Sequence, residues 1–275
     1  MLRKISILGG VGKDGNPEKV ERLDLYMGDV ISIVGPTGCG KTTLINDIEL
    51  FANKNTPSKR TILIDDLPIS SEYSYDPSQH PIAMISQHTN FLSDLPVSEF
   101  LTIHATIRGG SNIEELVDET IDFANQLTGE QIIRTSAMTE LSGGQTRSLL
   151  IADAVIIGHS PVILLDEIEN AGIHRTKALS LLKNYKKIFV FVTHDPRIAL
   201  LSDYRVVMKQ GAMQRIIVTN RDEKMAAVGL KKIDDVMLEC RKLIRAGDEI
   251  SDTVFSNLLT DMIEGCEEYL KTRPS

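Results

Sequence analysis

The chain has no tryptophan, and aromatic residues make up only 5% of its 275 residues. It has three cysteines, Cys39, Cys240 and Cys266, and their spacing fits neither a CxxC pair nor a zinc site. These absences argue against a disulfide-stapled fold and a structural zinc domain. We expect the cysteines to be free thiols in a reducing compartment.

Long hydrophobic runs are also missing. The apolar run Leu149–Ala152 is broken by Asp153, and the apolar segment Ile5–Leu8 is too short for a signal peptide. The sequence therefore predicts a cytoplasmic protein. The alternative is a peripheral position at the inner face of a membrane, reached through a separate partner.

An excess of basic residues is the third absence. The formal net charge is −8, so we expect no general affinity for nucleic acid. With 42% hydrophobic and 25% charged residues, the composition is typical of a globular protein. The length indicates one large domain, or a domain with an appendage.

The most informative stretch is a Gly-x4-Gly-Lys-Thr pattern between an apolar run, Val30–Val34, and a helical pattern, Leu44–Phe51. Glycines let backbone N–H groups approach phosphate oxygens, and the helix N-terminus favours anions. The alternative is a glycine-rich turn with an incidental lysine. The residues expected to bind phosphate are Gly35, Pro36, Thr37, Gly38, Cys39, Gly40, Lys41, Thr42 and Thr43.

A second candidate site follows the apolar run Val162–Leu165, which ends in Asp166 and Glu167. An aspartate in this position fits a carboxylate that helps to hold Mg2+ beside a P-loop. The glutamate after it is placed to polarise an attacking water as a general base. The alternative is a buried strand with a polar exit, which is common.

Three more features are weak when each is taken alone. Ser142 precedes Gly143, Gly144 and Gln145 at a predicted helix start, where an anion would meet the helix N-terminus. Gln87 and His194 each follow a predicted strand. An ordinary capped helix and two structural polar residues are the alternatives.

The remaining pattern alternates strands and helices. Two short strands around Ile5–Ile7 and Val20–Leu25 enclose a glycine-rich turn, and a helical insertion runs from Leu92 to Met138. The other expected elements are strands at 61–66, 82–86 and 187–193, helices at 141–157 and 176–184, a hairpin at 205–218 and charged helices from 220 onward.

In this order the motifs closely resemble those of the nucleotide-binding subunit of ATP-binding cassette (ABC) ATPases, over about residues 1–218. The resemblance implies an α/β, ABC-type P-loop NTPase with a mixed sheet and a helical subdomain at about residues 88–145. Residues 219–275 would form a helical C-terminal extension. The implied reaction is the hydrolysis of ATP to ADP and phosphate.

The resemblance also implies roles for individual residues. Lys41, Gln87, Glu167 and His194 would be catalytic, and ATP and Mg2+ would be the cofactors. Thr42, Gln87 and Asp166 would lie at Mg2+. Residues 142–145 would bind the γ-phosphate on the opposite protomer, so that a head-to-tail homodimer sandwiches two ATP molecules.

Two departures from the family pattern bear on the site, and a third is Asp153, which stands where an arginine is common. The region that matches the adenine-stacking aromatic is Gly9–Gly12, so base selectivity would be loose or supplied by an apolar residue such as Val11. Residues 168–173 replace the usual Pro-Thr-Ser-Ala-Leu-Asp, and the D-loop aspartate is missing. This second change predicts altered coupling across the dimer interface.

Three functions fit these patterns. The first is the energising subunit of an ABC transporter, paired with a separate transmembrane subunit. The second is a soluble ABC ATPase that assembles or remodels a non-transport protein partner. The third is a nucleotide-dependent dimerisation switch that hydrolyses little, and the presence of both Glu167 and His194 argues against it.

Overall fold

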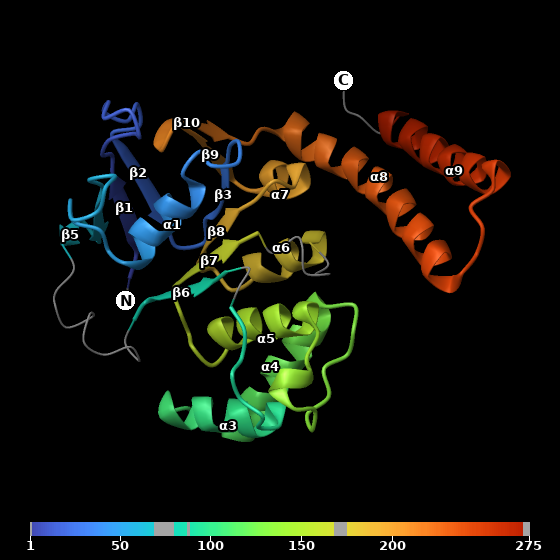
Figure 1. Ribbon diagram of the computed structural model, residues 1–275, viewed down its shortest axis with the longest axis horizontal. Helices are drawn as coiled ribbons and strands as arrows, with labels where there is room; N and C mark the ends of the chain where they lie inside the picture. The colour runs from blue at the N-terminus through green and yellow to red at the C-terminus, as the bar shows by residue number, and fades with distance from the viewer. Residues whose placement is uncertain (1, 69–79, 87–88, 168–174, 272–275) are drawn as a thin grey trace. The chain divides into compact units, whose positions relative to one another are not determined.

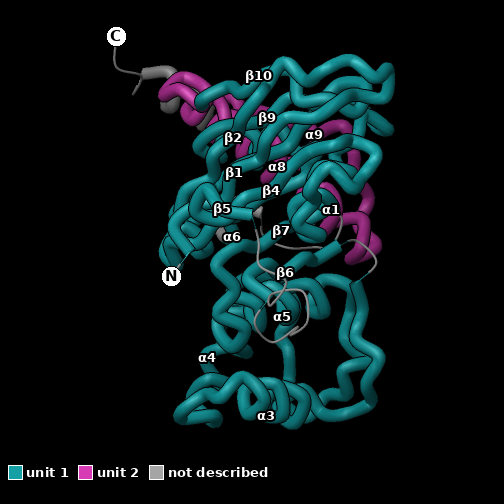
Figure 2. The backbone as a smooth tube through the Cα atoms, turned by 90° about the vertical axis from the view of Figure 1, so that its left-hand side faces the viewer, with its two compact units in different colours: residues 1–218 teal, residues 219–275 magenta. Residues whose placement is uncertain are grey.

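A computed structural model describes residues 2–68, 80–86, 89–167 and 175–271. The chain divides into two compact units, residues 1–218 and residues 219–275, which Figure 2 colours separately. Each unit is considered by itself below. The first holds both sheets.

A six-stranded sheet forms the centre of the first unit, with the order β10-β9-β3-β8-β7-β6. Its neighbouring strands run parallel except for the β9–β10 hairpin. The carboxyl ends of β3, β8, β7 and β6 therefore lie at one edge, where ligands bind in open parallel sheets. The strands are β3 (Val30–Val34), β6 (Ile82–Ile85), β7 (Val162–Asp166), β8 (Ile188–Val192), β9 (Tyr204–Lys209) and β10 (Ala212–Val218).

A second, antiparallel sheet has the order β2-β1-β4-β5. Its strands are β1 (Lys4–Leu8), β2 (Arg22–Tyr26), β4 (Thr61–Ile64) and β5 (Leu67–Pro68). The predicted strand at 61–66 is two residues too long, because Asp65 and Asp66 have positive φ angles of 48° and 69° and turn the chain into β5. The six-stranded sheet is the expected mixed sheet, because β10 runs antiparallel to its otherwise parallel strands, and the antiparallel sheet is separate from it.

Helices cover both faces of the six-stranded sheet. The helices of the first unit are α1 (Lys41–Glu49), α3 (Val97–Ile107), α4 (Ile113–Leu127), the short 3-10 helix η2 (Met138–Glu140), α5 (Gly143–Val155), α6 (Arg175–Lys183) and α7 (Pro196–Leu201). The predicted helical insertion is two helices, and residues 128–137 between α4 and η2 are not helical. Figure 1 shows α3, α4 and α5 grouped beside the strands.

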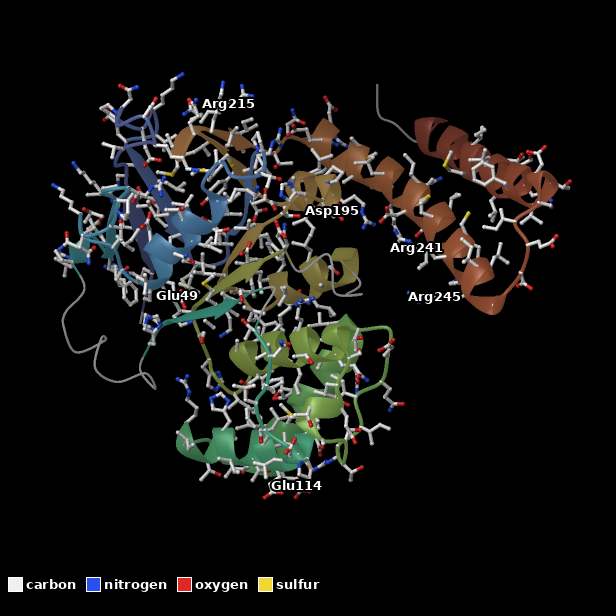
Figure 3. The ribbon with its side chains drawn as sticks, in the orientation of Figure 1. Glu49, Glu114, Asp195, Arg215, Arg241 and Arg245 are labelled. Atoms are coloured by element: carbon white, nitrogen blue, oxygen red, sulfur yellow. The ribbon has the colours of Figure 1, made fainter. Side chains whose placement is uncertain are left out.

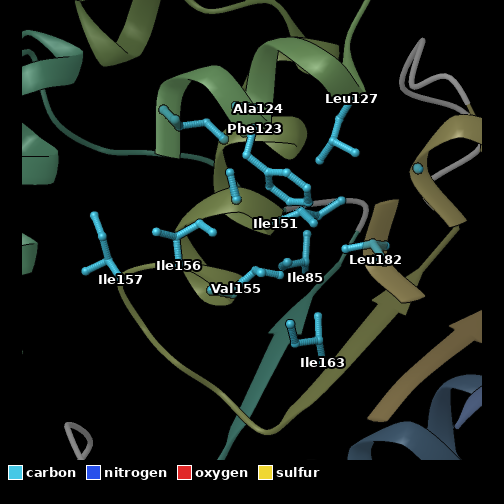
Figure 4. Close-up of a cluster of buried hydrophobic side chains, with 14 of the residues drawn as sticks. Ile85, Phe123, Ala124, Leu127, Ile151, Val155, Ile156, Ile157, Ile163 and Leu182 are labelled. Atoms are coloured by element: carbon cyan, nitrogen blue, oxygen red, sulfur yellow. The ribbon is translucent and has the colours of Figure 1, made fainter. Parts of the chain in front are cut away.

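The hydrophobic core consists of two clusters, one on each face of this sheet. Because side chains alternate along a strand, Ile163 and Leu165 enter the cluster that packs against α4, α5 and α6, part of which Figure 4 shows. Leu164 enters the other cluster, together with α1, β1, β2 and β4. Helices α1 and α5 therefore pack on opposite faces of the sheet.

The second unit is a pair of helices, α8 (Arg221–Ala246) and α9 (Asp252–Lys271), which pack against each other. Asn220 caps α8 by accepting from the backbone N–H of Glu223, and Gly247 ends it with a positive φ of 83°. Ile233, Met237 and Ile244 on α8 are exposed. None of the helices within the described residues is long and apolar enough to cross a membrane.

Candidate nucleotide-binding and hydrolysis site

The P-loop connects the end of β3 to α1. Gly35, Gly38 and Gly40 have φ angles of 154°, 74° and 97°, which favour glycine. Close packing adds to this requirement: a Cβ at Gly35 would lie 2.4 Å from the Met208 carbonyl oxygen, and one at Gly40 2.9 Å from Gly211 Cα. The local fold thus needs glycine at positions 35 and 40.

Lys41 begins α1 and folds back over the loop. Its Nζ donates to the carbonyl oxygens of Gly35 and Pro36 at 3.0 and 3.2 Å, and the residue is 7% exposed. The hydroxyl-bearing Thr42 beside it is exposed. A buried ammonium group inside a glycine-rich loop at a helix N-terminus fits a polyphosphate ligand.

The other residues of the predicted phosphate-binding loop differ in how much of their surface is exposed to solvent. Pro36, Thr37 and Thr43 are exposed, whereas Cys39 is a buried free thiol. The Cys39 Sγ lies 2.7 Å from where a Cβ at Gly35 would be. A side chain at position 35 would therefore collide with the Cys39 thiol.

Asp166 and Glu167 lie at the same sheet edge as the P-loop. Asp166 pairs in register with Val192 of β8, which pairs with Ile33 of β3, so the three strand ends are level. Glu167 has a positive φ of 50°, and its N–H donates to the Val192 carbonyl at 3.0 Å. A left-handed glutamate is uncommon, and such conformations cluster at functional sites.

His194 faces Glu167 across the ends of β8 and β7. Its Nε2 lies 3.4 Å from Glu167 Oε1, and the two side chains are 46% and 31% exposed. The next residue, Asp195, caps α7 by accepting from the Arg197 N–H at 2.7 Å and is labelled in Figure 3. The structure therefore brings a carboxylate and an imidazole together, and both side chains are partly exposed to solvent.

Residues 142–145, the signature residues, lie at the start of α5, which packs on the other face of the sheet. Ser142 and Gln145 form a capping box, in which the Ser142 N–H donates to Gln145 Oε1 at 2.8 Å. The Ser142 hydroxyl also donates to Glu130 Oε2 at 2.7 Å. Gly143 has open space around it. The helix predicted at 141–157 is confirmed, and it begins at Gly143.

Two contacts of the site were absent from the sequence expectations. The Lys13 Nζ, in the loop interpreted as a simple turn, donates to the P-loop carbonyl of Gly38 at 2.8 Å. Glu130 holds the signature serine, as described above. The only sequence signal for the Lys13 contact is a lysine in a glycine-rich loop. The sequence has no signal for the Glu130 contact.

Two sets of predicted residues lie outside the described part of the chain. Gln87, assigned to catalysis and to Mg2+, is one, and residues 168–173, with the unusual D-loop sequence, are the other. Val11, the proposed apolar base contact, is half-buried, and its N–H donates to the Ser58 carbonyl at 2.7 Å.

This fold and this arrangement define an ABC-type P-loop ATPase. Solved structures with the same fold include the dimeric ATP-binding cassette MJ0796 bound to ADP and phosphate, with a TM-score of 0.60, 21% identity, and coverage of 78% of this chain and 99% of that one. Another is CbiO1 from Clostridium perfringens, part of the transporter complex CbiONQ, with a TM-score of 0.59, 22% identity, and coverage of 86% and 99%.

Sequence comparison gives the family. The model of the ABC transporter family matches residues 19–170, more than half of the chain. An uncharacterised ABC transporter ATP-binding protein of Methanocaldococcus jannaschii is 46% identical over 250 residues, 91% of this chain and 95% of the relative. The spermidine/putrescine import ATP-binding protein PotA of Bacillus cereus is 31% identical over 70% of this chain, which spans 59% of PotA.

The chain belongs to the ABC transporter family, as an ATP-binding subunit that hydrolyses ATP. This outcome confirms the family, the fold class and the ATPase reaction that the sequence indicated.

Proposed function

We propose that two copies of this chain, arranged head to tail, hydrolyse ATP with Mg2+ in two shared sites and thereby energise a transporter. The proposal is carried by one observation: the P-loop helix α1 and the signature helix α5 pack on opposite faces of the same sheet. The Ser142 end of α5 therefore suits the nucleotide of a second copy better than its own.

Within one copy, the P-loop side of the site would bind the phosphates. The Lys41 ammonium, which now donates to two backbone carbonyls, would turn to the β- and γ-phosphates. The Thr42 hydroxyl, Asp166 and Gln87 would hold Mg2+, because hydroxyl, carboxylate and amide oxygens are ligands that this ion accepts. The ion itself would neutralise charge on the phosphate oxygens.

Glu167 and His194 would act on the attacking water. The Glu167 carboxylate would accept a proton from it, and His194, 3.4 Å away, would orient the water and contact the γ-phosphate. The backbone at Glu167 is left-handed, with a φ of 50°, and such conformations cluster at functional sites.

The second copy would supply Ser142, Gly143, Gly144 and Gln145. Ser142 already has an ordered hydroxyl, fixed by Glu130 and by the capping box. The two exposed groups at this helix start, the serine and the open Gly143, are those a γ-phosphate would meet first. ATP would thus join the two copies, and hydrolysis would release them.

For the membrane component, we propose a separate transmembrane subunit, so that the chain lies at the inner face of the membrane through that partner. Support comes from the family and from the relatives, whose names describe them as ABC transporter and import ATP-binding proteins. The described helices of this chain include none suited to span a membrane.

A second candidate is a soluble ABC ATPase that drives assembly or remodelling of a non-transport protein. It is favoured by the second unit, whose helix α8 presents exposed apolar residues such as Ile233 and Met237. Those side chains would offer a protein partner a surface beyond the cassette.

The shared-site proposal is tested with Glu167→Gln. This change should lower turnover by at least about a hundredfold, leave ATP binding intact and produce an ATP-dependent dimer, because the base is lost while the phosphate contacts remain. Light scattering with ATP, and with ADP as the control, measures the dimer. A Glu167→Gln chain that stays monomeric at saturating ATP would contradict the shared site.

The choice between the two partner classes needs a separate experiment. The tagged Glu167→Gln chain would be recovered from its native source, once from detergent-solubilised membranes and once from the soluble fraction. A multi-span membrane protein that copurifies with it supports transport. Recovery of soluble partners alone would favour the assembly or remodelling function.

A further inference from the structure

Arg60, the residue before β4, has a guanidinium group with no exposed surface. Its Nε and one terminal nitrogen donate to the two carboxylate oxygens of Glu18 at 3.0 and 2.7 Å. The other terminal nitrogen donates to Asp47 Oδ2 at 2.7 Å. Glu18 is 5% and Asp47 2% exposed, so these three charges are buried together.

A buried charge is costly to a fold unless it is paired and hydrogen-bonded. Burial lowers the pKa of Arg60, but the hydrogen bonds and charges of Glu18 and Asp47 more than offset this, and the net direction is upward. An apolar cluster of the same volume would often be equally stable. Stability alone therefore does not explain these buried charges, and what their hydrogen bonds add is a fixed geometry.

The three residues connect four segments. Glu18 also accepts the backbone N–H groups of Gly10 and Met213, from the glycine-rich loop and from β10. Asp47 belongs to α1. A terminal nitrogen of Arg60 donates to the Gly211 carbonyl, in the β9–β10 turn, at 2.6 Å.

Three of these segments reach the P-loop directly. Helix α1 begins at its last residues. The Gly211 N–H donates to the Cys39 carbonyl at 2.8 Å, and its Cα lies 2.9 Å from where a Cβ at Gly40 would be. The glycine-rich loop brings Lys13, whose Nζ donates to the Gly38 carbonyl at 2.8 Å.

Lys13 is held in this place by its backbone as well. Its N–H donates to the Gln210 carbonyl at 2.7 Å, and its side chain packs over Gly211, where a Cβ would lie 2.8 Å from Lys13 Cγ. The ammonium group is thus an exposed positive charge fixed at the rim of a loop that receives a polyphosphate.

We propose that Arg60 is a positioning residue of the nucleotide site. It fixes the position of the P-loop through the segments packed against that loop, and it places the Lys13 ammonium beside the P-loop, where this charge attracts the polyphosphate. The proposal rests on nucleotide binding at the P-loop and adds two residues to the site. Arg60 acts through Glu18, Asp47 and Gly211 and does not itself touch the nucleotide.

The first test compares Arg60→Lys with wild type in the full chain, using calorimetry with ADP and Mg2+. Lysine keeps the charge but loses the bidentate geometry. We expect affinity to fall about tenfold and the KM for ATP to rise, with kcat unchanged within about twofold. Leu101→Ala, a buried substitution on α3, is the control for lost stability and should leave affinity unchanged.

The second test asks whether Lys13 carries part of this effect. Lys13→Ala should weaken affinity about threefold and reduce its salt dependence. Lys19→Ala removes an exposed lysine of the same segment, which makes no P-loop contact within the described residues, and should change neither the affinity nor its salt dependence. In the double variant, Lys13→Ala should lower the affinity for ADP by less than it does in wild type, because Arg60 and Lys13 act through one contact.

The proposal is overturned if Arg60→Lys binds ADP as tightly as wild type, or if Leu101→Ala loses as much affinity as Arg60→Lys does. It is also overturned if the affinity losses of Arg60→Lys and Lys13→Ala are fully additive in the double variant. Glu18→Gln, which keeps the side-chain shape, replaces Arg60→Lys if that variant does not fold. Lys41→Ala should remove binding in every background. Should it fail to do so, the P-loop assignment itself would be wrong, which is a separate outcome.

Discussion

At the scale of single residues, Lys187 shows how a buried charge makes stability depend on pH. It precedes β8, is 9% exposed, and its Nζ donates to the Ser160 carbonyl at 3.0 Å. Burial lowers the pKa of Lys187 from 10.5 to about 8. The unfolded chain therefore binds this proton more tightly than the folded chain does, and the stability of the fold rises with pH between about 8 and 10.5.

Lys187→Met removes this titration. The difference in unfolding free energy between wild type and variant should shift by about 2 kcal/mol in favour of wild type between pH 7 and pH 10. Urea unfolding at several pH values in this range measures it. Lys54→Met, at an exposed lysine, is the matched control and should show no such shift. A constant difference for Lys187→Met would mean that the ammonium group is not desolvated.

The sequence indicates candidate site residues where their position depends on local spacing. The P-loop glycines, Asp166 and Glu167 follow strands, and a strand end can be recognised from an apolar run. Lys13 and Arg60 could not be found in this way, because their partners are 25 and 42 residues away in the sequence at Gly38 and Glu18. Such contacts arise from packing, which leaves no periodic signal.

At the scale of elements, α4 joins the helical group to the rest of the first unit. Phe123 on α4 is 3% exposed and packs edge-on against Tyr185, which follows α6, with ring centroids 5.0 Å apart. Figure 4 shows Phe123 amid the cluster that includes Ile85 and Ile151. This ring therefore fills space between the helices and the sheet.

Phe123→Ala should destabilise the chain by about 3–5 kcal/mol, because it removes buried area and leaves a cavity. The neighbouring Asp122→Ala, at an exposed position of the same helix, should change stability by less than about 0.5 kcal/mol. Denaturant unfolding of both variants gives the comparison. A loss below about 1 kcal/mol for Phe123→Ala would show that the cluster repacks around the vacancy.

The sequence predicts some helices and strands better than others. Strands at 30–34 and 162–166 were clear because they are buried on both faces and read as continuous apolar runs. Helix α7 was missed, although Asp195 as cap and Pro196 in the first turn are its start signals. It has only six residues, which is too short to show a helical period.

At the scale of the whole molecule, the site and its support belong to the first unit. Both core clusters are built from residues before 219, and so are the described residues assigned to the nucleotide. The second unit consists of α8 and α9, which pack on each other. We infer that residues 1–218 form the catalytic cassette and that 219–275 serve another purpose.

A chain that ends at Val218 should therefore fold and bind ADP with Mg2+ within about threefold of the full chain, since the P-loop, its buried Arg60 network and both clusters remain. Thermal unfolding with and without ADP would measure both properties. The same truncation with Lys41→Ala should unfold without any stabilisation by ADP. If the truncated chain folds but has lost ADP binding, the second unit contributes to the nucleotide site, and the division of roles proposed here is wrong.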